Sequence, residues 1–112
     1  MKYTIKYYET SSGNVPLEKF LKKLLKDYKN DDVTQIMLYI KQLELYGLDI
    51  NDKFRPEAMK RLRGKICELR PDNNRVLFFY KKGSEFILLH GFTKTTKKTP
   101  KSMGRVGITV IW

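Results

Sequence analysis

The sequence predicts an α+β fold, with two antiparallel helices packed on one face of a small, mainly antiparallel sheet. Apolar residues recur at helical spacing from residue 17 to residue 28 and again from residue 33 to residue 43. From residue 66 onward the pattern changes to short apolar runs separated by turn residues, which is typical of strands. A chain of 112 residues suits one domain, so we expect residues 1–112 to form a single domain.

The first strand and the first helix are predicted from residues 1–28. Residues 1–8 alternate apolar and polar side chains, which predicts a strand with one wet face, and residues 11–14 form a turn. Pro16 suits the first turn of a helix. The apolar side chains of that helix are Leu17, Phe20, Leu21, Leu24, Leu25 and Tyr28.

A second helix follows a polar break in the pattern. Asn30, Asp31 and Asp32 supply a predicted N-terminal cap, and Gly47 is a natural stop. The predicted buried stripe consists of Val33, Ile36, Met37, Ile40 and Leu43. The short connection implies that the two helices are antiparallel.

Three strands and two turns are predicted next. Residues 66–70 alternate, residues 71–74 turn the chain, and residues 75–80 are apolar enough for a central strand. A hairpin turn at 81–84 leads into a buried strand at 85–92, and the N-terminal strand joins the edge of this three-strand meander. Residues 102–112 are rich in glycine and β-branched residues, so an added strand and disorder both remain open.

The positive charge is concentrated in the second half of the chain. The formal net charge is +11, of which residues 1–53 carry +1, residues 54–75 carry +4 and residues 76–112 carry +6. A one-sided cationic excess favours a nucleic-acid partner over simple solubilisation of the surface. The single cysteine, Cys67, excludes an intramolecular disulfide and a cysteine-based zinc site. With no apolar run long enough for a membrane span or signal peptide, we expect a cytoplasmic protein without a membrane association.

The candidate site is a cluster of cations around one carboxylate. Alternation places Glu68 and Arg70 on the face opposite Cys67 and Leu69, and Arg70 and Arg75 flank the turn at 71–74. Reversal of the meander brings Lys94, Lys97 and Lys98 back beside that turn, and further cations precede the strand: Lys60, Arg61, Arg63 and Lys65. A structural salt bridge and a functional carboxylate are both compatible with Glu68.

Two other reactive residue types are interpreted as structural. Cys67 is predicted to be a small core side chain rather than a nucleophile. His90, the sole imidazole, is expected in line with Phe86, Leu88 and Phe92. This placement favours a packed, structural histidine, and a catalytic role remains the alternative.

Two blocks of sequence resemble the HigB-type, phage-derived branch of the RelE/ParE toxin superfamily. The first comprises Leu62-Arg63-Gly64, Glu68-Leu69-Arg70-Pro71 and the run from Asn74 to Phe79; the second is the run from Phe86 to Pro100, which contains Leu88-Leu89-His90-Gly91-Phe92. The resemblance implies a RelE-like fold and the toxin of a type II toxin–antitoxin pair. It also implies an endoribonuclease that cleaves mRNA, often on the ribosome, without a metal or other cofactor. The implied partner is a helix-turn-helix, HigA-type antitoxin, whose complex with the toxin binds operator DNA.

The resemblance also implies roles for individual residues. In such a nuclease the ribose 2′-OH attacks the adjacent phosphate, which calls for a base, an acid and cations that stabilise the phosphorane. Arg75 matches the arginine that opens the central strand and is the candidate for phosphate stabilisation, assisted by Arg70 and Arg63. Glu68 or His90 is the candidate base, and Lys94 or Lys97 the candidate acid or phosphate contact. The remaining RNA-binding candidates are Lys60, Arg61, Lys65 and Lys98.

The chain departs from the family pattern in two places. Ile66 and Glu68 stand where RelE-like members carry paired lysines, so a lysine-based mechanism is not expected. Residues 102–112 do not resemble the basic C-terminal helix of the family, which puts full activity in question. A ParE-like inhibitor of DNA gyrase and a non-catalytic RNA-binding or decayed toxin are the alternative functions.

Overall fold

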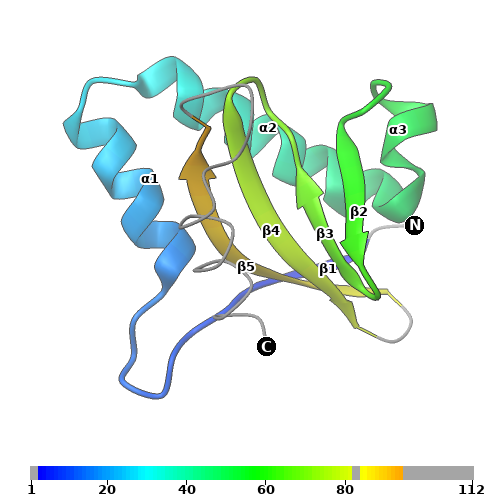
Figure 1. Cartoon of the computed structure of the whole chain (residues 1–112), viewed down its shortest axis with the longest axis horizontal. Coiled ribbons are helices and arrows are strands. Elements are labelled where there is room, and N and C mark those ends of the chain that lie inside the picture. The colour runs from blue at the N-terminus through cyan, green and yellow to red at the C-terminus, as the bar shows by residue number, and fades with distance from the viewer. Residues whose placement is uncertain (1–2, 82–83, 95–112) are drawn as a thin grey trace.

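The computed structural model describes residues 3–81 and 84–94 and confirms the predicted α+β class (Figure 1). Two main helices accompany a five-stranded mixed sheet. In chain order the elements are β1 (Thr4–Tyr7), α1 (Pro16–Lys26), α2 (Asn30–Tyr46), a 3₁₀ turn (Gly47–Asp49), α3 (Ile50–Lys53), β2 (Met59–Arg63), β3 (Ile66–Leu69), β4 (Asn74–Lys81) and β5 (Glu85–Thr93).

The strands lie in the order β1-β5-β4-β3-β2. The predicted meander corresponds to β3, β4 and β5, which pair antiparallel. β1 joins the edge of this meander beside β5, as expected, and the structure shows that this pairing is parallel. One strand was missing from the prediction: β2 pairs antiparallel with β3 and extends the meander to four strands. Only the first residue of β2 is buried, so this edge strand lacks the apolar alternation that identifies a strand in sequence.

Helix α1 begins at Pro16, as predicted, and buries Leu17 and Leu24. Its predicted apolar stripe was too long, because Leu25 is 49% exposed and Tyr28 is 93% exposed. The helix ends at Lys26, and Tyr28 has a φ of 60°, which rotates its side chain away from the stripe.

Helix α2 differs from the prediction at its start and along its stripe. It begins at Asn30, and no side chain caps it, so the proposed cap is wrong. Met37 is 42% exposed and Tyr39 takes its place in the core with 4% exposure. Gly47 ends the helix as predicted, with a φ of 58°, and its missing side chain leaves room for the Tyr3 ring. Among the described residues no helix is both long and apolar enough to cross a membrane.

The two faces of the sheet bury separate apolar clusters. The larger cluster lies between the helices and the sheet, and Figure 1 shows α2 crossing behind the strands. Ile66, Leu77, Leu89 and Phe92 form the second cluster, on the opposite face. We call that opposite face the open face, because none of the described helices covers it.

A bulge in β5 decides which residues reach the open face. Leu77 pairs with His90 and Phe78 pairs with Leu88, so Leu89 is an extra residue in β5. Phe86 and Leu88 therefore point into the helix-side core, whereas Phe92 belongs to the open-face cluster. His90 stacks on Phe92 with a centroid distance of 6.3 Å, so its predicted alignment with Phe86 and Leu88 is wrong.

Candidate functional site

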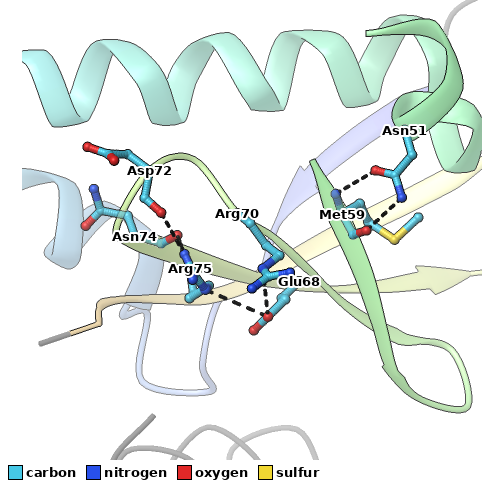
Figure 2. A network of polar contacts seen from close by, with 7 residues as sticks. All are labelled: Asn51, Met59, Glu68, Arg70, Asp72, Asn74 and Arg75. Carbon is cyan, nitrogen blue, oxygen red and sulfur yellow. Dashed lines mark hydrogen bonds and ion pairs between the residues drawn. The ribbon is translucent and has the colours of Figure 1, made fainter. Parts of the chain in front are cut away.

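Two arginines converge on one carboxylate at the end of the sheet where β3 turns into β4. The Glu68 Oε2 atom lies 3.7 Å from Arg70 Nε and 3.8 Å from Arg75 Nε. Figure 2 shows both guanidinium groups directed toward the Glu68 carboxylate. The predicted proximity of these three side chains is therefore confirmed, and the cluster forms because β3 and β4 are joined by a short turn.

Arg75 is the most tightly held member of this cluster. Its side chain is 8% exposed, and its Nη1 atom donates hydrogen bonds to the carbonyl oxygens of Asp72 (2.9 Å) and Asn74 (2.8 Å). Burial lowers the pKa of the Arg75 guanidinium, while the Glu68 carboxylate opposes this shift by stabilising the charged form. Among the described residues, the Nη2 atom of Arg75 has no hydrogen-bond acceptor.

A buried amide fixes the turn that carries Arg75. Asn74 is fully buried, and its Nδ2 atom donates to Asp32 Oδ2 of α2 at 3.0 Å. The Thr93 hydroxyl at the end of β5 donates to Asn74 Oδ1 at 2.7 Å. The turn also contains Asp72 with a φ of 58°, a left-handed conformation that aspartate tolerates better than most residues. Two other elements, α2 and β5, thus hold the backbone from which Arg75 projects.

The predicted lysines at the end of β5 fall partly within the described residues. The Lys94 amide donates to the Asn73 carbonyl at 2.7 Å, which brings Lys94 beside the turn as predicted. Lys97 and Lys98, like the atypical tail at 102–112, lie outside the described residues.

The cations of β2 are divided between the two faces. Lys60 lies directly opposite Glu68 in the β2–β3 register, and Arg63 lies opposite Ile66, so both are on the open face. Arg61 lies opposite Cys67 on the other face, and its Nη1 atom donates to the Gly64 carbonyl at 3.3 Å. Lys65 follows the strand and places its ammonium 5.6 Å from the Tyr80 ring centroid. Of these four cations, Lys60 is the direct cross-strand neighbour of Glu68.

His90 lies in the same transverse row as Glu68, with Leu77 between them. Neighbouring strands are about 4.8 Å apart, so the two backbones are about 10 Å apart. Burial lowers the pKa of His90, which favours the neutral imidazole. His90 therefore faces the cluster's side of the sheet but does not touch Glu68.

Cys67 is fully buried in the helix-side core, as predicted. Burial raises the pKa of its thiol, which disfavours the reactive thiolate. Within residues 3–81 and 84–94 there is also no group of three or more His, Cys, Asp or Glu side chains arranged to hold a metal ion.

Sequence reasoning did not identify four polar residues that support the site. Asp32, Asn74 and Thr93 form the buried network described above. Asn51 in α3 bonds both backbone groups of Met59, accepting from the amide at 2.8 Å and donating to the carbonyl at 2.9 Å, and so anchors the start of β2 (Figure 2). Asn74 is the first residue of β4 and directly follows polar turn residues, so its type and position gave no signal that its side chain is buried.

This geometry suits the binding of a phosphate and the stabilisation of added negative charge on it. Two adjacent guanidinium groups supply directional donors, and the carboxylate between them supplies a proton acceptor. No curated protein matches the chain. Residues 19–106, however, match the family described as phage derived protein Gp49-like (DUF891). Since this match covers most of the chain, the protein belongs to the Gp49-like family, a RelE/HigB-like family of toxins from toxin–antitoxin systems.

Proposed function

We propose that this toxin is a HigB-type endoribonuclease with a RelE-like fold that cleaves mRNA on the ribosome in the cytoplasm without a metal ion. The observation that carries the proposal is the convergence of Arg70 and Arg75 on Glu68. The reaction is attack of a ribose 2′-OH on the adjacent phosphate, with departure of the 5′-oxygen of the next nucleotide. It needs positive charge at the phosphate and a nearby proton acceptor, and the three side chains supply both.

Arg75 is proposed to stabilise the phosphorane. Its Nη1 donors are used by the carbonyls of Asp72 and Asn74, so the guanidinium plane is fixed before RNA binds. The Nη2 donors, which have no acceptor among the described residues, are then directed at a non-bridging phosphate oxygen. Arg70 assists on the same phosphate, and Lys60 and Arg63 hold the flanking backbone phosphates from β2.

Glu68 is proposed as the general base in preference to His90. The Glu68 carboxylate is next to both arginines, whereas His90 is separated from it by Leu77. A base has to lie within hydrogen-bonding reach of the 2′-OH while the arginines hold the phosphate, and this favours the closer group. Lys94, whose backbone is bonded to Asn73 at the same turn, is proposed to protonate the leaving oxygen.

The family assignment implies an antitoxin partner. We propose that this partner is a helix-turn-helix protein of the HigA type, and that its complex with the toxin binds operator DNA. The cationic second half of the chain supports contact with RNA and the ribosome.

Primer extension on cellular transcripts after toxin induction tests the proposal. The wild-type chain is expected to produce discrete cuts, and Arg75→Ala to reduce the cleavage rate by about 10²–10³-fold, as loss of one charge-stabilising donor does elsewhere. Arg75→Lys keeps the positive charge but loses the planar set of guanidinium donors, so it is expected to cleave faster than Arg75→Ala but more slowly than the wild type. Lys53→Ala, which removes an exposed cation on α3, is the matched control and is expected to cut normally.

The thermal midpoint of each purified variant separates loss of activity from loss of fold. Intact transcripts during wild-type growth arrest would remove the nuclease proposal, and arrested replication with intact transcripts would support a gyrase inhibitor instead. Equal cleavage by a folded Arg75→Ala variant would contradict the role of Arg75.

A further inference from the structure

A groove runs between α1 and the last residues of β5, and Phe92 in its lining is the cross-strand neighbour of Arg75. Its volume is about 660 Å³, which is within the range of ligand-binding clefts in proteins. The apolar part of its lining comes from Pro16, Phe20, Leu24 and Phe92. The groove is thus an apolar surface that borders the edge of the sheet.

The groove exists because β1 is shorter than β5. β1 pairs with β5 only from Glu85 to Leu88, so β4 is the only described strand that pairs with the remainder of β5. Gly91 allows α1 to pack closely on this end of β5, since a Cβ atom there would lie 2.5 Å from the Phe20 ring. An apolar floor beside a strand edge that no described strand pairs with is a surface that proteins ordinarily cover.

The rim of the groove is cationic. Lys19 and Lys23 are four residues apart on α1 and Lys29 follows the helix; all three are exposed and line the groove. Among the described residues that line the groove, Asp27 is the one acidic side chain. A partner that fits this surface has apolar side chains for the floor and acidic side chains for the rim.

We propose that this groove binds the antitoxin through an acidic segment that also carries apolar side chains. The lysine rim calls for acidic side chains in the partner because opposite charges attract, and the apolar floor calls for apolar side chains. A protein segment fits better than RNA does, because RNA would place its charged backbone against Phe20, Leu24 and Phe92. The proposal follows from the toxin–antitoxin family and does not depend on the RNA-cleavage proposal.

The position of the groove gives the antitoxin a route to the candidate site. Thr93 lines the groove and also donates its hydroxyl hydrogen to Asn74, the neighbour of Arg75 in the chain. A segment bound in the groove therefore lies against the strand end that supports Arg75. The antitoxin can then neutralise the toxin by contacting the strand end that supports Arg75, as well as by blocking the access of RNA.

Titration calorimetry of the purified full-length toxin with its cognate antitoxin tests the proposal. In the Lys19→Glu, Lys23→Glu double variant the Kd is expected to rise at least about ten-fold, because two attractive rim charges become repulsive. The wild-type Kd is also expected to rise with salt, and the double variant to lose most of that dependence. Lys22→Glu is the matched control: it reverses an exposed charge on the same helix outside the groove, and its Kd is expected to stay within two-fold of wild type.

The outcomes separate this inference from the proposed nuclease function. Thermal midpoints confirm that each variant is folded. A double variant that still cuts transcripts but is no longer neutralised by the antitoxin supports the groove whatever residues catalyse cleavage. An unchanged Kd in the folded double variant, or an equal loss in Lys22→Glu, would overturn it. Loss of cleavage with normal antitoxin affinity would assign the lysine rim to RNA instead.

Discussion

Asn74→Ala tests how strongly the buried amide holds the fold and the turn before Arg75. The substitution removes the bond to Asp32 at 3.0 Å and the bond from Thr93 at 2.7 Å. A hydrogen bond to a charged group contributes about 1.5–3 kcal/mol and a neutral one about 0.5–1.5 kcal/mol. Asn74 is fully buried, so water cannot easily reach the Asp32 and Thr93 groups that lose their hydrogen-bond partner. We therefore expect the free energy of unfolding to fall by about 2–4 kcal/mol.

Urea unfolding followed by circular dichroism measures this change, with Asn73→Ala as the control. Asn73 is exposed and uses its backbone carbonyl for the bond from Lys94, so its side chain is expected to contribute less than about 0.5 kcal/mol. A double-mutant cycle with Asp32→Ala is expected to show a coupling of at least about 1 kcal/mol. Additive effects, or equal losses in the two asparagine variants, would refute the reasoning.

Three further predictions concern a glycine, the histidine and the cysteine. Gly47→Ala is expected to lower the free energy of unfolding by at least about 1 kcal/mol more than Gly64→Ala, because both have positive φ but only Gly47 would clash, with its Cβ 2.6 Å from the Tyr3 ring; denaturant titration compares them. Because burial lowers the pKa of His90, the unfolded chain binds a proton at this residue more readily than the folded chain does. The contribution of the neutral His90 to the free energy of unfolding is therefore fully present above about pH 6.5 and is lost as the pH falls through the folded pKa. Thermal midpoints between about pH 7.5 and 5 are therefore expected to fall less steeply in His90→Gln, and parallel curves would contradict this. The Cys67 thiol is expected to react slowly with a disulfide reagent at about pH 8 until denaturant is added, and rapid labelling of the native protein would contradict this prediction.

The elements with a strong apolar period could be predicted from the sequence, and those without one could not. The apolar residues at 17–43 and in β4 and β5 indicate which positions are buried, because burial along a helix or strand repeats with the period of that element. β2 escaped prediction because four of its five residues are exposed at an edge. Met37 and Tyr39 exchanged roles because both fit an apolar stripe by type, and tertiary packing chooses between them.

The candidate site was predictable as far as strand alternation and a short turn determine it. Those rules are enough to bring Arg70 and Arg75 to Glu68. They fail for His90, because one extra residue at Leu89 reverses the alternation and nothing in the local sequence marks the bulge. They also cannot anticipate the bond between Asp32 and Asn74, whose partners are 42 residues apart and meet only through tertiary packing.

The carboxylate between the two arginines has a consequence for the protein before it meets any substrate. Two guanidinium groups in close proximity repel one another, and a fold that assembled them alone would be weakened by that repulsion. Glu68 acts as an internal counterion that holds both guanidinium groups together in the absence of any ligand. An incoming phosphate therefore competes with an anion that belongs to the protein itself. The affinity for an anionic ligand at this site is therefore the difference between its attraction to the two arginines and that of the Glu68 carboxylate, which favours fast exchange of the ligand.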